Sequence, residues 1–170
     1  MLWIVDADWN DAEHADAVLH LLDSYASDPM GGNEPLSSYV KDHLISELAK
    51  RDTAHVILAF DEETPVGLMV CFEGFSTFVC KPLLNIHDVI VHADHRGKGV
   101  ATAMFSYTED KARQMGCCKL TLEVLSENKV AQSLYTKCGF AGYELKPETG
   151  HALFWQKKLD SFKTSGSKTI

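Results

Sequence analysis

Two glycines and two cations occur together directly after an apolar strand pattern. The strand pattern ends at Val91, and the run Arg96-Gly97-Lys98-Gly99 precedes a helical pattern. The N-terminus of a helix presents backbone N–H groups without helical partners, together with the positive end of the helix dipole. Glycine leaves those donors open to a ligand, and the two side-chain cations add positive charge. This run, called the anion loop below, is therefore predicted to bind a phosphate or pyrophosphate.

Two common phosphate motifs do not fit the anion loop. The dinucleotide fingerprint requires G-x-G-x-x-G, but after Gly97 and Gly99 the third small residue, Ala101, comes one position early. No run matches the G-x-x-x-x-G-K-[ST] pattern of a P-loop. The pattern that does match is Arg-x-x-Gly-x-Ala, from Arg96 to Ala101. Because a solvated basic loop can carry this short pattern too, the surrounding elements must decide.

A helix, a strand and a second helix are predicted after the anion loop. Apolar and small residues recur at helical spacing from Ala101 to Met115, and Gly116 can end that helix. Residues 118–124 alternate as in a strand with one buried face. Asn128 can cap the second helix. The apolar stripe of that helix consists of Ala131, Leu134, Tyr135 and Cys138, with Gly139 at its end.

This order of elements resembles the core of the GNAT superfamily, the acyl-CoA-dependent N-acetyltransferases. Arg96-x-x-Gly99-x-Ala101 resembles that family's pyrophosphate loop, and residues 128–140 resemble its second cofactor motif. The resemblance implies an α/β (α+β) GNAT fold, a mixed, twisted sheet of about six or seven strands flanked by about four helices. Its fourth and fifth strands are expected to splay apart, with the pantetheine arm of acetyl-CoA between them.

The remaining elements are expected in the order typical of that fold, in one domain over residues 1–159 with a disordered tail at 160–170. Helices are predicted from Asp11 to about Ser27 and from Ser37 to about Arg51. The expected strands are 2–5, 54–60, 66–73, 83–91, 118–124, 140–145 and 151–158.

The resemblance also implies which residues contact acetyl-CoA, the expected co-substrate. The backbone groups of Val89 and Val91 would bind the pantetheine arm as an added strand does. Asn128 would contact the arm from the second helix. The pyrophosphate would lie on the anion loop and the first helical turn, formed by Arg96, Gly97, Lys98, Gly99, Val100, Ala101 and Thr102.

Three side chains are candidates for proton transfer. Tyr135 matches the family's tyrosine at the sulfur and would act as the acid, although its place on an apolar stripe also suits a core residue. His87 occupies the position of the family's usual carboxylate base, and Asp88 matches an acid beside it. Strand alternation is expected to place His87, Val89 and Val91 on one face and Asp88 on the other. His87 could equally contact substrate or play a structural role, and the Val91 N–H is a candidate oxyanion donor.

Bulk composition limits the function classes. The 170 residues are 45% hydrophobic and 24% charged, with a net charge of −8, which argues against binding to nucleic acid or anionic membranes. No signal peptide or membrane span is visible, and the five cysteines are expected to be mostly buried, reduced thiols of a cytoplasmic protein. No metal site is expected, because the spacing of His87, His92 and His95 fits none.

The leading hypothesis is an acetyltransferase acting on a primary amine. The residues before Lys41 include eight acids, which favours a cationic small molecule as acceptor. They are Asp6, Asp8, Asp11, Glu13, Asp16, Asp23, Asp28 and Glu34. Alternative acceptors are a protein lysine or N-terminus, and the alternative class is a non-catalytic acyl-CoA-binding module. A homodimer is left open.

Overall fold

A computed structural model describes residues 1–29, 31–143, 150, 152–157 and 159. The chain forms two compact units, Met1–Leu122 and Glu123–Ile170, which are described separately below. The elements in chain order are β1 (Leu2–Asp6), α1 (Ala12–Ala26), α2 (Ser38–Ala49), β2 (Ala54–Asp61), β3 (Thr64–Ser76), β4 (Lys81–Val91), the 3-10 turn η1 (Ala93–His95), α3 (Val100–Gln114), β5 (Leu120–Leu122) and α4 (Lys129–Lys137).

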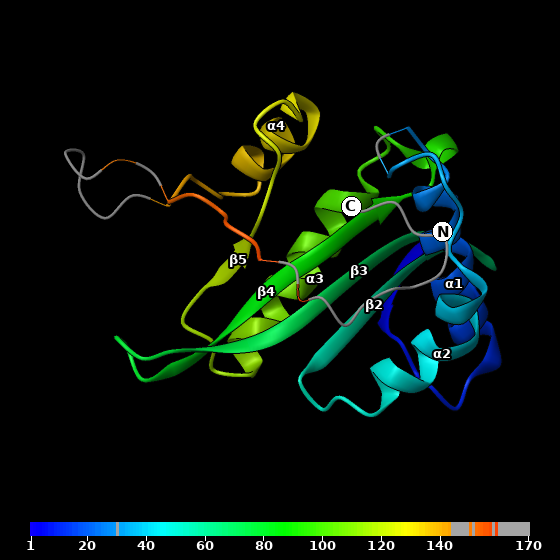
Figure 1. The fold of residues 1–170 in the computed structure, drawn as a ribbon, viewed down its shortest axis with the longest axis horizontal. Helices are drawn as coiled ribbons and strands as arrows, with labels where there is room; N and C mark the ends of the chain where they lie inside the picture. Colours follow the sequence, from blue (N-terminus) through cyan, green and yellow to red (C-terminus); the bar gives the residue numbers. More distant parts are fainter. Residues whose placement is uncertain (30, 144–149, 151, 158, 160–170) are drawn as a thin grey trace. The chain divides into compact units, whose positions relative to one another are not determined.

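The first unit is built on a mixed sheet whose strand order is β1-β2-β3-β4-β5. The first four strands are antiparallel neighbours, whereas β5 runs parallel to β4. Figure 1 shows β3 and β4 as the two long central strands, joined in a hairpin. The parallel β4–β5 pair requires a crossover, and α3 provides it.

Helices cover both faces of this sheet. On one face, residues of α1 and α2 pack with alternate residues of β3, including Leu68 and Val70. On the other face lies α3: Thr108 donates a hydrogen bond to the sulfur of Met69 at 3.1 Å. A Cβ placed on Gly67 would lie 2.6 Å from the sulfur of Met104. Even and odd positions of β3 therefore belong to opposite cores, as expected for a central strand buried on both sides.

The predicted helix starts are confirmed. Asp11, Ser37 and Asn128 each accept a hydrogen bond from a backbone N–H in the first turn of the following helix. Gly116 follows α3 with φ of +74°, the left-handed conformation typical of a helix end. Helix α1 buries Ala17, Val18 and Leu21, and its partly buried Leu22 and Tyr25 pack against the same core.

The sheet has fewer strands than the expected six or seven. Five are present in the described residues, and β5 covers Leu120–Leu122 rather than 118–124. The predicted strands 140–145 and 151–158 are not formed in their described parts, 140–143 and 152–157. A backbone hydrogen bond of 3.2 Å from Ala152 to Tyr143 nevertheless joins those two segments. The remainder of both strands and the tail 160–170 lie outside the described residues.

The cysteines differ from the expectation in their burial. All five are free thiols, but only Cys71 is buried, whereas Cys80 is exposed and the other three are half-buried. Burial raises the pKa of Cys71 to about 12, so this thiol stays protonated and behaves as a small apolar side chain. None of the helices in the described part of the chain has the length and apolar composition needed to cross a membrane.

Candidate active site

A β-bulge in β4 shapes the candidate site. Val70 of β3 pairs with Asp88 of β4, and the next residue, Cys71, pairs with Ile86. His87 is therefore an extra residue without a partner in β3, as in a β-bulge. The bulge changes which face of the sheet each later residue of β4 meets.

The pairing before and after the bulge shows this change. Ile86 pairs with Cys71, which is on the α3 side of β3. Ile90 pairs with Leu68, and both belong to the core that includes α1 and α2. Strict alternation would have put Ile86 and Ile90 on the same face. The extra residue, His87, shifts the alternation by one position, so that Ile86 and Ile90 lie on opposite faces of the sheet.

The expected placement of His87 and Asp88 on opposite faces was consequently wrong. Asp88 pairs with Val70 and so lies on the α1 and α2 side of the sheet. The His87 ring meets Phe72 edge to face, at 5.6 Å between ring centroids, and Phe72 packs against the same core. Both polar residues thus lie on one face, while Val89 lies on the α3 side opposite them.

Asp88 and His87 differ in their surroundings. The Asp88 side chain is half-buried, and this desolvation raises its pKa, an effect that the neighbouring His87 partly opposes. His87 is exposed. A carboxyl with a raised pKa beside an accessible imidazole is an arrangement that can accept a proton and pass it to solvent.

The edge of β4 beyond the bulge extends past its neighbour. The β4–β5 ladder covers Leu84–Ile86, which leaves the end of β4 beyond the last residue of β5. The His92 N–H donates to the Val66 carbonyl of β3 at 2.9 Å. Because backbone groups alternate in direction along a strand, those of Val91 and Val89 point away from β3. This geometry agrees with the splaying expected between the fourth and fifth strands.

Both glycines of the anion loop are in the left-handed backbone conformation. Gly97 and Gly99 have φ of +75° and +85°, which favours glycine, and a Cβ built on either meets nothing within 4 Å. Gly99 is the N-cap of α3 and makes no side-chain capping bond. The first helical bond runs from the Ala103 N–H to the Gly99 carbonyl, so the N–H groups of residues 100–102 precede it. These donors lie at an exposed, glycine-lined surface suited to an anion.

Arg96 connects the anion loop to two other parts of the first unit. Its Nε donates to the Val91 carbonyl at 3.2 Å, and its Nη2 lies 3.2 Å from the Asp28 carboxylate. Asp28 belongs to the loop between α1 and α2. In the sequence Asp28 is only one of several acids, since no local pattern indicates a contact across 68 residues. Lys98, the second cation of the loop, is exposed.

The other two candidate residues belong to the second unit. The Asn128 side chain caps α4 by accepting from the Ala131 N–H at 3.1 Å. Tyr135 is half-buried on α4, and its ring lies 6.2 Å from that of Phe140. No residue of α4 is fully buried, and this includes Tyr135.

Three histidines lie close together near the anion loop, with His20 stacked on His92 and His95 edge to face with it. The rings of His92 and His95 are 5.9 Å apart between centroids, and His20 of α1 lies 6.5 Å from His92. Among the described residues, no group of three or more His, Cys, Asp or Glu side chains is arranged to hold a metal ion.

The glycine-lined start of α3 thus lies next to the end of β4 that extends past β5. The Acetyltransferase (GNAT) family model matches residues 16–140, which is well over half of the chain. The chain therefore belongs to the GNAT acetyltransferase family.

Curated relatives extend this result. A streptothricin acetyltransferase of Escherichia coli is 28% identical over 156 residues, covering 85% of this chain and 86% of the relative. A glucosamine 6-phosphate N-acetyltransferase of Arabidopsis thaliana is 29% identical, covering 62% of this chain and 71% of the relative. Among solved structures, an aminoglycoside acetyltransferase from an uncultured soil metagenomic sample, in complex with sisomicin, is 16% identical with a TM-score of 0.76. That alignment covers 93% of this chain and 96% of the other, and at this level of identity it shows that the two chains share a fold.

Proposed function

We propose that this protein transfers an acetyl group from acetyl-CoA to a primary amine of a cationic small molecule. The observation that carries this proposal is the bulged end of β4. It combines a half-buried carboxyl whose desolvation raises its pKa, an exposed imidazole and a strand end that extends past β5, next to the anion loop. Family membership supports the acetyl transfer, and the streptothricin acetyltransferase relative supports a small basic acceptor.

The residues present fit acetyl-CoA. The N–H groups of residues 100–102 and the exposed cations Arg96 and Lys98 suit its pyrophosphate, and the glycine loop leaves room for it. The outward-pointing backbone groups of Val89 suit the amides of its pantetheine arm, and the Val91 N–H points the same way, while the Val91 carbonyl accepts from Arg96. Bound there, the co-substrate supplies an acetyl group activated as a thioester.

Asp88 is proposed as the proton acceptor. An alkyl amine arrives as an ammonium ion and must lose a proton before its nitrogen can bond to the acetyl carbon. The raised pKa of Asp88 makes its carboxylate a stronger base than an exposed one. His87, next to Asp88 on the same face, is proposed to take that proton on to solvent.

Tyr135 is proposed as the proton donor on the leaving side. As the N–C bond forms, the C–S bond breaks and the sulfur leaves with its electron pair. The Tyr135 hydroxyl would give a proton to that sulfur, and the Val91 N–H would stabilise the charge on the acetyl oxygen. Two protons thus leave the nitrogen: one passes through Asp88 to solvent before attack, and the second, lost as the amide forms, balances the proton that Tyr135 gives to the thiol.

Release of free CoA thiol in the presence of a panel of amines tests the proposal. The panel should include streptothricin, an aminoglycoside, a polyamine, an amino acid amide and a lysine-containing peptide. We expect thiol release with at least one of the cationic small molecules and an acetylated product by mass spectrometry. Turnover with the peptide alone would assign a protein acceptor instead.

The same assay distinguishes the enzyme from a non-catalytic acyl-CoA-binding module. Such a module would bind acetyl-CoA with measurable heat but release no thiol with any amine. Absence of binding to both acetyl-CoA and CoA would contradict the proposed cofactor site itself.

A further inference from the structure

The loop between α1 and α2, residues 27–37, is organised around Asp28. The carbonyl of Asp28 accepts the N–H groups of Gly31 at 2.8 Å and Asn33 at 3.3 Å. Its carboxylate lies 3.2 Å from Nη2 of Arg96, in the anion loop. Asp28 therefore joins the conformation of the α1–α2 loop to the position of one cation in the proposed cofactor site.

Both ends of the α1–α2 loop are held against α1. Asp23 of α1 accepts the Leu36 N–H at 2.8 Å and pairs with Lys41 of α2 at 2.8 Å. Gly31 lies so close to the end of α1 that an added Cβ would be 1.8 Å from the Tyr25 carbonyl oxygen. The described part of this loop is thus a defined structure, and the Asp28 carboxylate is its ionic contact with the anion loop.

Two anions can pair with Arg96: the Asp28 carboxylate and a pyrophosphate bound to the anion loop. Its contacts with Val91 and Asp28 use two of the five N–H donors of a guanidinium group. A pyrophosphate on the anion loop would place further negative charge beside the same guanidinium. Opposite charges at this range attract strongly and like charges repel, so a polyanion and the Asp28 carboxylate compete for Arg96.

We propose that Asp28 is a positioning residue whose ion pair with Arg96 is broken when a polyanion binds the anion loop, which leaves the α1–α2 loop held only by its own backbone bonds and its contacts with α1 and α2, and therefore more easily opened. This inference rests on the proposed function for the identity of the polyanion. Coupling between two binding events is reciprocal. If opening the α1–α2 loop raises polyanion affinity by some factor, polyanion binding must raise the equilibrium constant for opening that loop by the same factor.

Calorimetry on the full chain with inorganic pyrophosphate and, separately, with CoA tests the competition. Asp28→Asn keeps the side-chain shape and removes its charge. We expect the variant to bind both probes more tightly, by about threefold to tenfold, because Arg96 no longer has an anionic partner. Asp52→Asn, a change of the same charge at an exposed position after α2, should leave both affinities unchanged. Unchanged or weaker binding by Asp28→Asn overturns the proposal.

Amide hydrogen exchange of peptides from the α1–α2 loop tests the release. In the unaltered protein, we expect CoA to speed exchange at Gly31, Asn33 and Leu36, whose N–H groups are bonded to Asp28 or Asp23. In Asp28→Asn, exchange should already be fast and CoA should change it little. Slower or unchanged exchange on adding CoA to the unaltered protein contradicts the proposed release.

A second variant approaches the same contact from the loop. Gly31→Ala forces the α1–α2 loop away from α1 without altering either ion-pair residue. It should raise CoA affinity as Asp28→Asn does, and CoA affinity that stays unchanged would contradict the coupling. If neither pyrophosphate nor CoA binds the unaltered protein, both this inference and the proposed cofactor site fail. If they bind and Asp28→Asn leaves their affinity unchanged, this inference alone is overturned.

Discussion

At the scale of single residues, the two glycines of the anion loop allow a direct test of the cofactor site. Gly99→Ala should weaken acetyl-CoA binding by about tenfold or more, measured by calorimetry. The added methyl group would lie where the backbone must approach the pyrophosphate, and φ of +85° is strained for alanine.

Gly116→Ala is the matched control for this strain. Gly116 follows the other end of α3 with φ of +74°, and its added Cβ also meets nothing within 4 Å. Both variants should lose similar stability, about 1 kcal/mol. Only Gly99→Ala should lose acetyl-CoA affinity. Equal affinities would show that the anion loop does not hold the cofactor.

Asp88 should lower the free energy of unfolding at pH values at which its carboxyl is ionised. Its pKa is raised above the ordinary value of 3.8, chiefly by burial, so folding favours the protonated form. Stability is therefore fully present below the unfolded pKa and declines as pH rises through the folded value. Asp88→Asn should melt at a higher temperature than the unaltered protein at pH 7, and the difference should vanish near pH 3.

The same variant should lose activity. If Asp88 accepts the amine proton, Asp88→Asn should reduce kcat by about 100-fold or more. His87→Gln should reduce it less, since its proposed role is to pass the proton on. A fully active, more stable Asp88→Asn protein would leave His87 as the remaining base candidate on this face.

Tyr135 can be tested by removal of its hydroxyl alone. Tyr135→Phe should lower kcat by about 10²- to 10⁴-fold, the usual contribution of a general acid, and should leave the melting temperature nearly unchanged. Loss of stability with retained turnover would instead support the alternative that Tyr135 serves packing, where it meets Phe140.

At the scale of elements, the helix starts and the place of the glycine loop before α3 were predictable, whereas the bulge in β4 was not. Caps such as Ser37 and glycines such as Gly99 act locally, so their residue types suffice. A bulge depends on the register between two strands, which the local sequence does not specify. One signal was available: the polar pair His87-Asp88 interrupts an apolar run in a strand buried on both faces.

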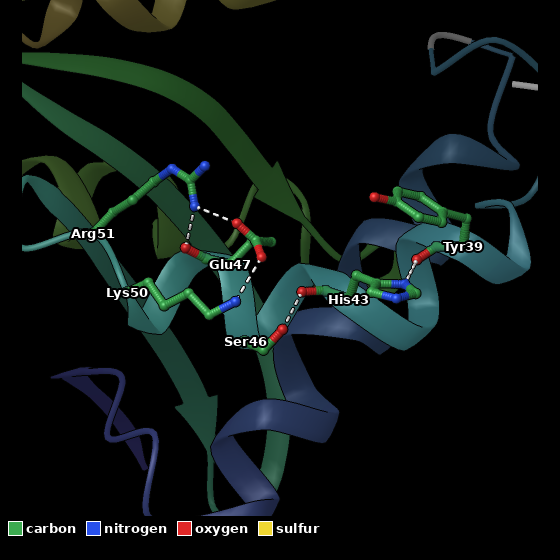
Figure 2. A network of polar contacts seen from close by, with 6 residues as sticks. All are labelled: Tyr39, His43, Ser46, Glu47, Lys50 and Arg51. Carbon is green, nitrogen blue, oxygen red and sulfur yellow. Dashed lines mark hydrogen bonds and ion pairs between the residues drawn. The ribbon is translucent and has the colours of Figure 1, made fainter. Parts of the chain in front are cut away.

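Helix α2 combines a small face packed on the core, formed by Leu44, Ile45 and Leu48, with ion pairs on its exposed surface. Leu48 is its one buried residue, and Figure 2 shows Glu47 between Lys50 and Arg51. Hydrogen bonds from Lys50 and then Arg51 lower the pKa of Glu47 from 4.5 to about 2. Since the folded pKa is lowered, this stabilisation is present above pH 4.5 and is lost as pH falls towards 2.

Glu47→Gln tests that contribution. The variant should melt slightly below the unaltered protein at pH 6, because exposed ion pairs contribute little, and the two should converge near pH 2. Thermal unfolding followed by circular dichroism between those pH values gives the comparison. A constant difference across the whole range would assign the effect to helix propensity and not to ionisation of Glu47.

At the scale of the whole molecule, the acidic N-terminal region is less uniformly negative than its sequence suggests. Three of its acids are paired with cations: Asp6 with Lys111, Asp23 with Lys41 and Asp28 with Arg96. Two of these cations lie far along the chain, so no count of charges in the first 40 residues could have shown the neutralisation. The acids that remain exposed include Glu13, Asp16 and Glu34.

These exposed acids should steer a cationic acceptor towards the first unit. Attraction between exposed charges is screened within about 8 Å at physiological salt. We therefore expect kcat/KM for the preferred amine to fall as salt is raised from 20 to 300 mM, roughly severalfold. Asp16→Asn combined with Glu34→Gln should lower kcat/KM at low salt and flatten its salt dependence, whereas Asp52→Asn should do neither. A preferred acceptor that is neutral, with kinetics independent of salt, would show that these acids only solvate the surface.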